Sequence, residues 1–163
     1  MQISENAGTS PGRVLIFPAQ VPKVADREVH FLFSLRQMED ILMDAAVRPV
    51  PFSPAYIEGI ARWRNLILPV VSLEKCLGLA SLEVRKHQRL MVVRAPQKAA
   101  SQPGANRIML RVVPPIRMLM LPIDCSPVSD GWISEPNLTR AVYEWQNGFL
   151  VVAHLENILQ GNN

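Results

Sequence analysis

Short apolar runs bounded by turn residues recur along the chain, and they predict β-strands rather than long helices. Residues 13–17 form one such run, which Pro18 ends. Residues 29–35 alternate, so Phe31 lies on the apolar face of a strand and His30 on the other. We therefore expect His30 to be a half-exposed strand residue rather than a ligand. Further strands or short apolar elements are expected at residues 90–93, 107–113, 116–121, 141–145 and 149–153.

The stretch 53–78 predicts a β-hairpin around which the other elements are organised. Its tip is the polar sequence 62–65, which is expected to show two arginines and a tryptophan to solvent. The tip is followed by the most continuous apolar run in the chain, residues 66–71. Residues 72–82 then predict a short helix that Gly78 ends early.

A weak internal repeat predicts that this unit occurs twice. The Asn147-Gly148 pair between two apolar runs is a strong hairpin signal. The residues around it repeat the order of a hairpin tip, a buried strand and a short Leu-Glu helix, so 66–77 resembles 149–159. Two such units favour two similar β-subdomains with a shared interface.

The segment 38–43 is ambiguous between a strand and a helix. Its apolar residues are spaced as in a helical turn, but Pro49 and Pro51 follow soon after and prevent a longer helix. We expect a strand end or a single turn that leads into a loop. Met38 and Ile41 are then either core residues or an exposed apolar contact.

The length and composition of the chain fit one domain of ordinary size. We place this domain at residues 13–160, after a flexible tail at residues 1–12. Apolar residues make up 48% of the 163 residues and the net charge is +3, which excludes wholesale disorder. The N-terminus has no secretory signal pattern, and no apolar run approaches the ~18 residues of a membrane span. The sequence therefore indicates a cytoplasmic protein.

No pattern in the sequence indicates catalysis. There is no glycine-rich phosphate loop, and His30, His87 and His154 are isolated from any ligand spacing. Cys76 and Cys125 lie in or beside apolar segments, so they are expected to be buried free thiols. We therefore expect no catalytic residue, no metal site and no cofactor, and we favour a binding module.

At the central hairpin the sequence resembles the CheW family, the adaptors of bacterial chemosensory arrays. Residues 53–59 match its Pro-Ala-aromatic-Ile-x-Gly turn, and 60–73 match the strand, arginine tip and Ile-x-Pro-Val strand that follow without a gap. Upstream, residues 38–41 resemble the family's Val-x-Glu-Ile. The likeness runs from Arg13 to Leu159. Departures such as Asn65, in place of the family's glycine, leave a flagellar pathway and a pilus or other pathway both open.

The resemblance implies a mainly β fold of two intertwined five-stranded SH3-like β-barrel subdomains with short helices. It also implies a non-catalytic adaptor in a two-component chemosensory system. The expected partners are the regulatory domain of a CheA-type histidine kinase and the cytoplasmic tip of a methyl-accepting chemoreceptor. No nucleic acid is expected as a partner, and the membrane is reached only indirectly through receptors.

The resemblance and the hairpin together supply the expected binding residues. Arg64 matches the arginine of the family motif, and we hypothesise that it pairs with Asp40 to brace the surface where a partner helix docks. The expected receptor- or kinase-binding residues are Arg64, Met38, Asp40, Ile41, Glu58, Arg62 and Trp63.

Two other classes of function remain as alternatives. The first is a nucleic-acid-binding β-barrel that stacks bases on Trp63 and uses Arg62, Arg64 and the basic cluster 85–89. The second is a small-molecule enzyme with Cys76 or Cys125 as its nucleophile.

Overall fold

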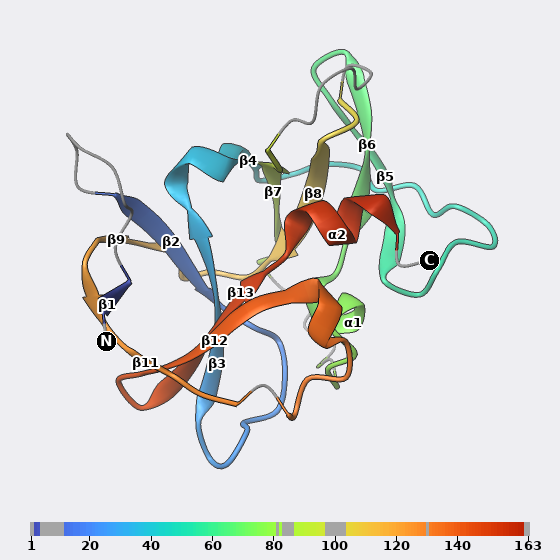
Figure 1. Cartoon of the computed structure of the whole chain (residues 1–163). Helices are drawn as coiled ribbons and strands as arrows, with labels where there is room; N and C mark the ends of the chain where they lie inside the picture. The colour runs from blue at the N-terminus through green and yellow to red at the C-terminus, as the bar shows by residue number, and fades with distance from the viewer. Residues whose placement is uncertain are drawn as a thin grey trace.

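The computed structural model describes residues 2–3, 12–80, 82, 87–96, 104–129 and 131–161. They form a mainly β structure in which two twisted sheets lie against each other, with a short helix after each of two hairpins (Figure 1). The predicted mainly β fold of two SH3-like subdomains is confirmed, although the sheets do not close into full barrels. Among the described residues, none of the helices has the length and apolarity needed to cross a membrane.

The first sheet has six strands, one more than expected, in the order β11-β12-β13-β3-β2-β9. It combines strands from both ends of the chain, and β13 runs parallel to β3. A separate pair of two-residue strands joins β1 to β10. The bounds are β1 Gln2–Ile3, β2 Arg13–Pro18, β3 Glu28–Ser34, β9 Arg117–Met120, β10 Ile123–Asp124, β11 Ser126–Pro127, β12 Thr139–Trp145 and β13 Gly148–Ala153.

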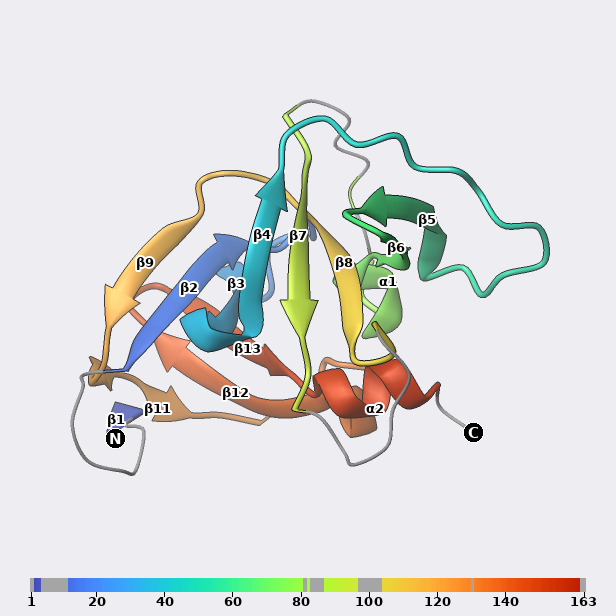
Figure 2. The ribbon, with the colours of Figure 1, turned by 90° about the horizontal axis from the view of Figure 1, so that it is seen from above.

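The second sheet has five strands in the order β4-β7-β8-β6-β5 and uses the middle of the chain. The chain therefore leaves the first sheet after β3 and returns to it at β9, which is how the two subdomains intertwine (Figure 2). The bounds are β4 Met38–Leu42, β5 Ile57–Trp63, β6 Leu66–Val71, β7 Arg89–Arg94 and β8 Arg107–Val112. The helical elements are the 3-10 turns η1 Leu35–Gln37 and η2 Pro136–Leu138 and the helices α1 Leu73–Cys76 and α2 Leu155–Gln160.

One core is shared by the two sheets. The period-2 pattern of β2 turns Leu15 and Phe17 toward that core, while Val14 and Ile16 join a second cluster on the other face. Phe17 stacks on Phe33 with ring centroids 5.8 Å apart, and the same cluster takes Met91 and Leu110 from the second sheet. Because side chains from both sheets interdigitate in it, neither sheet has a separate core on this side.

The predicted internal repeat is present in three dimensions. Hairpin β5–β6 leads into α1, and hairpin β12–β13 leads into α2. The first tip residue of each hairpin has a left-handed backbone, with φ 53° at Arg64 and 51° at Gln146. Each helix begins at a side-chain cap, which is Ser72 for α1 and His154 for α2. The same local chemistry therefore builds both units.

Residues 38–42 form strand β4, the first of the two forms expected for this segment. The turn comes earlier, at residues 35–37, where Ser34 and Gln37 form a capping box. Two other local predictions need correction. The helix expected over 72–82 is only residues 73–76. The side chain of His30 is 12% exposed, so it is mostly buried rather than half-exposed. The tail at residues 1–12 lies mainly outside the described residues.

Cys76 and Cys125 are buried thiols outside any disulfide, as expected. Burial, with a smaller effect of the Glu135 carboxylate, raises the pKa of the Cys76 thiol to about 11. The thiolate is the nucleophile, so at pH 8 only about one Cys76 in 1,000 is reactive even before access is considered.

We therefore expect iodoacetamide to label neither cysteine in the folded protein at pH 8. Mass spectrometry after a timed reaction checks this, and the same reaction in urea should label both. Rapid labelling of either thiol in the folded protein would restore the nucleophilic-cysteine alternative.

Candidate functional site

The two edge strands of the second sheet, β4 and β5, approach each other at the tip of hairpin β5–β6. The indole Nε1 of Trp63, the last residue of β5, donates a hydrogen bond to Oδ2 of Asp40 on β4 over 2.8 Å. The guanidinium of Arg64 lies over the Trp63 ring, 4.4 Å from its centroid. Trp63 therefore joins the two edges beneath the arginine that the family motif singles out.

Trp63 is buried, which corrects the prediction that it is shown to solvent. It is 6% exposed and packs with Ala61 and Leu68 in a cluster inside the second sheet. The alternation of β5 turns residues 59, 61 and 63 inward and leaves Arg62 exposed. Because β5 extends to residue 63, its alternation turns the Trp63 side chain inward. The same alternation can be counted along residues 59–63 of the sequence.

The hypothesised direct pair between Arg64 and Asp40 is also wrong. Oδ2 of Asp40 accepts from the Trp63 indole, and its Oδ1 accepts from the backbone N–H of Ile41 over 2.8 Å. Among the ion pairs formed by the described residues, none joins Arg64 to a carboxylate. Arg64 instead stacks on the indole, so the brace runs from Asp40 through Trp63 to Arg64.

A two-pronged ion pair fixes β4 against β8 beside this brace. Arg107 donates from Nε to Oε2 of Glu39 over 2.6 Å and from a terminal nitrogen to Oε1 over 3.2 Å. Arg94 on β7 lies 3.5 Å from the same carboxylate. The hydrogen bond from Arg107, together with nearby positive charge, holds the pKa of Glu39 below its usual value. Glu39 is therefore ionised at neutral pH, and its carboxylate is occupied by Arg107 and Arg94 within the sheet.

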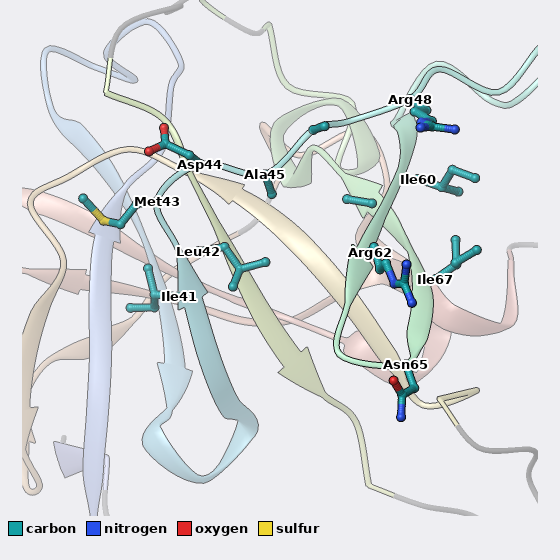
Figure 3. Close-up of a pocket in the computed structure, with 12 residues that line it drawn as sticks. Ile41, Leu42, Met43, Asp44, Ala45, Arg48, Ile60, Arg62, Asn65 and Ile67 are labelled. Atoms are coloured by element: carbon teal, nitrogen blue, oxygen red, sulfur yellow. The ribbon is translucent and has the colours of Figure 1, made fainter.

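An open groove of about 890 Å³ lies between β4 and hairpin β5–β6 (Figure 3). One end is bounded by the Trp63 brace. At the other end Arg48 and Ile60 form an isolated antiparallel bridge, with N–O distances of 2.9 and 2.8 Å. Its lining is largely apolar, and two of the lining side chains are unusually exposed: Met43 at 60% and Ile67 at 68%. The groove is lined by residues 41–46, 48, 60–62, 65 and 67.

Arginines surround this groove, and its lining also carries one carboxylate, that of the exposed Asp44. Arg48 and Arg62 line it, both exposed, and Arg64 stacks beside it. The Nε of Arg62 donates to the backbone oxygen of Arg64 over 3.3 Å. Among the described residues no ion pair occupies any of the three. An apolar surface framed by available guanidinium groups suits a protein partner that carries apolar side chains and a carboxylate.

The structure brings five of the seven predicted binding residues together. Ile41 and Arg62 line the groove, and Asp40, Trp63 and Arg64 form the brace at its end. The other two lie elsewhere. Met38 packs half-buried against the shared core. Glu58 pairs with Arg111 and, at 3.6 Å, with Lys75.

Sequence reasoning missed the apolar residues that make the groove, namely Leu42, Met43, Ala45, Ile60 and Ile67. Ile67 does not stand out in the sequence, because it lies within the continuous apolar run of β6. The run alternates in the structure, with residues 68 and 70 buried and residue 67 exposed, so a strict period-2 count would have found it.

The structure weakens the nucleic-acid alternative. Because Trp63 is buried and covered by Arg64, its ring is not an open platform for stacking a base. Residues 85 and 86 of the basic cluster 85–89 lie outside the described residues. Within the described part of the chain, no group of three or more metal-ligating side chains is found.

Tryptophan at position 63 provides a direct test of the brace. Trp63→Phe removes the donor to Asp40, and we expect a loss of about 1–3 kcal/mol in the free energy of unfolding, because a partly buried carboxylate loses its partner. A urea denaturation cycle with Asp40→Ala and the double mutant should show a coupling of about 0.5–3 kcal/mol. Arg62→Ala, beside Trp63 but exposed, is the control and should show no coupling with Asp40. Additive effects of the Trp63 and Asp40 changes would contradict the brace.

The chain is similar to known proteins in sequence and in fold. The family model described as "CheW-like domain" matches residues 21–102, half of the chain. "Chemotaxis protein CheW" of Thermotoga maritima is 34% identical over 62 residues, which is 38% of this chain and 40% of that relative. Across nearly the whole chain, the fold matches the crystal structure of the scaffolding protein TtCheW from Thermoanaerobacter tengcongensis. That match has a TM-score of 0.66 and 19% identity, and it covers 98% of this chain and 94% of the other.

Proposed function

The chain belongs to the CheW-like domain family, and on that premise we propose that it is a non-catalytic signalling adaptor. It couples a CheA-type histidine kinase to methyl-accepting chemoreceptors in a chemosensory array. Residues 13–160 act as a single domain of two subdomains, and the adaptor works in the cytoplasm. The named role of the Thermotoga maritima relative in chemotaxis supports this proposal, although the match spans only 40% of that protein.

The observation that carries the proposal is the groove between β4 and hairpin β5–β6. An exposed apolar groove loses free energy when a partner removes its surface from water, by roughly 25 cal/mol per Å². Met43 and Ile67 are the most exposed apolar side chains of this groove. Arginine beside such a surface is a residue type enriched among binding hot spots.

We assign the groove to the regulatory domain of the kinase. Ile60 and Ile67 supply its apolar surface, while Arg62 and Arg64 supply charge-assisted hydrogen bonds to a carboxylate of the partner. The brace holds the backbone of the hairpin tip in place before binding, so little ordering entropy is lost on association.

An adaptor needs a second surface for its second partner. We assign the receptor tip to the start of β4, where Met38 lies half-buried against the shared core. Ile41 packs against the same core and also lines the groove, so it stands where the two surfaces meet. Asp40 acts from the same strand as a positioning residue, because its carboxylate is engaged by Trp63 and by its own strand.

Paired binding measurements test this assignment. We expect Ile67→Glu and Arg62→Glu each to weaken binding of a kinase regulatory domain at least about 10-fold, while binding of a receptor-tip fragment stays within about 2-fold. Met38→Ala should do the reverse. Calorimetric titration of both ligands against each variant gives the two affinities.

Met118→Ser is the matched control, since Met118 is 54% exposed on β9 of the other sheet. It should leave kinase binding unchanged. Unchanged kinase affinity in both groove variants, with intact thermal melts, would refute the assignment. Tight binding of single-stranded DNA that weakens steeply with salt would favour the nucleic-acid alternative instead.

A further inference from the structure

A second pocket, of about 390 Å³, lies at the first sheet and shares no lining residue with the groove of the second sheet. It is formed where the connection between β2 and β3 meets the tip of hairpin β12–β13, with the start of β9 beside them. Pockets of this size take small molecules. The lining is largely polar and consists of Lys23, Asp26, Glu28, His30, Arg117, Trp145 and residues 146–148.

Two tight turns form walls of this pocket. Val24 and Arg27 exchange backbone hydrogen bonds of 3.0 and 2.9 Å, and the two residues between them have left-handed backbones, with φ 48° and 62°. The turn of hairpin β12–β13 is equally short, because Trp145 pairs directly with Gly148. Both turns therefore keep their shape without a ligand, so little ordering entropy is lost when one binds.

His30 contributes an uncharged polar ring to the pocket. The ring packs edge-on against Trp145, with centroids 6.1 Å apart, and its buried Nδ1 has no hydrogen-bond partner among the described residues. Burial, aided by the nearby Arg117, outweighs the opposing effect of Glu28 and holds the pKa of His30 below its usual value. The ring is therefore neutral at neutral pH. Since Nδ1 is closed off, the polar atom that it offers to a ligand is Nε2.

Charges of both signs line the pocket without pairing with one another. Lys23 and Arg117 supply two cations, and Asp26 and Glu28 supply two carboxylates. Among the ion pairs of the described residues, none joins one of these cations to one of these carboxylates. The guanidinium of Arg117 lies over the Trp145 ring, 5.4 Å from its centroid, and this stacking leaves the N–H groups in its plane available to a ligand.

This combination of charges selects the class of ligand. An anion alone gains from the two cations but is repelled by the two carboxylates, and a cation alone meets the converse repulsion. A ligand that carries one charge of each sign is attracted by both pairs of side chains and repelled by neither when it binds in the matching orientation. The pocket therefore fits a zwitterion better than a simple ion.

We propose that this pocket binds a small zwitterion of the amino-acid type, with its carboxylate held by Arg117 and Lys23 and its ammonium group held by Glu28 and Asp26. The neutral imidazole and the side-chain amides of turn 146–147 then form hydrogen bonds to a polar side chain of the ligand. The inference goes beyond the adaptor role and depends on neither the groove nor the kinase. Either proposal can therefore fail alone.

NMR of the indole N–H groups tests the proposal, because Trp145 lines the pocket while Trp63 lies in the second sheet and serves as an internal reference. On titration of the full chain with L-glutamine to about 20 mM, we expect a saturable shift at Trp145 with a Kd of about 1 mM or below, and no shift at Trp63. Acetate and methylammonium carry one charge each. They should bind at least about 10-fold more weakly, because each lacks one of the two charge-assisted contacts.

Variants that remove one charge locate the site. Arg117→Gln and Glu28→Gln should each weaken L-glutamine binding at least about 10-fold. Lys23→Gln, in an exposed loop, should weaken it about 3-fold and is the further variant in case the loss of Arg117 disturbs Trp145. Arg36→Gln removes an exposed arginine of η1 outside the pocket and is the matched control, with unchanged affinity. The proposal is overturned by the absence of a saturable shift at Trp145, by acetate or methylammonium binding as tightly as L-glutamine, or by unchanged affinity in both Arg117→Gln and Glu28→Gln.

Discussion

The hydrogen bond from Trp63 to Asp40 is the interaction on which the proposed binding surface depends. A five-stranded sheet that does not close has two edges with unpaired backbone groups, and such edges associate unspecifically unless something covers or joins them. In this protein β4 and β5 are those edges. They are joined at one end by the Trp63 indole and at the other by the backbone bridge between Arg48 and Ile60. The groove is the unclosed section between these two points.

This geometry explains why apolar and charged residues gather in one place. Leu42 and Ala45 pack partly against the cluster inside the second sheet and are left partly open along the groove, while Ile60 reaches it from the other face of β5. Arg64 stands beside the groove at the tip of the hairpin, where its left-handed backbone turns the chain and the Trp63 indole holds its guanidinium. The ion pair of Glu39 with Arg107 keeps β4 in register with the rest of the sheet. The same arrangement of β4 and β5 therefore stabilises the hairpin tip and leaves the groove open to a partner.

The repeated unit shows how far local sequence determines this structure. Both hairpins and their short helices follow from local turn chemistry, which is why they could be predicted. The caps at Ser72 and His154, which the structure shows, are equally local. The second hairpin also ends its first strand with a buried tryptophan, Trp145, under an arginine, Arg117, 5.4 Å from the ring centroid. That arginine comes from β9, far away in sequence, so no local sequence pattern predicts this contact.

The errors share one physical origin. The polarity of residues 62–65 predicts an exposed Trp63, whereas the alternation along β5 turns its side chain into the sheet. The hypothesis of a direct pair between Arg64 and Asp40 left out the Trp63 indole, which is the donor that Asp40 binds. The groove was missed because it forms only when β4 and β5, the outermost strands of one sheet, approach each other. Local periodicity predicts strands and faces, but contacts between distant strands depend on tertiary packing.

Methyl NMR with labelled isoleucines tests the central claim, that the unclosed section of the second sheet is the surface that docks the kinase. Ile41, Ile60 and Ile67 line the groove, while Ile16 and Ile108 are buried in the core and serve as internal references. On titration with a kinase regulatory domain, the account predicts shift changes at Ile60 and Ile67 with little change at Ile16 and Ile108. Binding that leaves the methyls of Ile60 and Ile67 unmoved would contradict it.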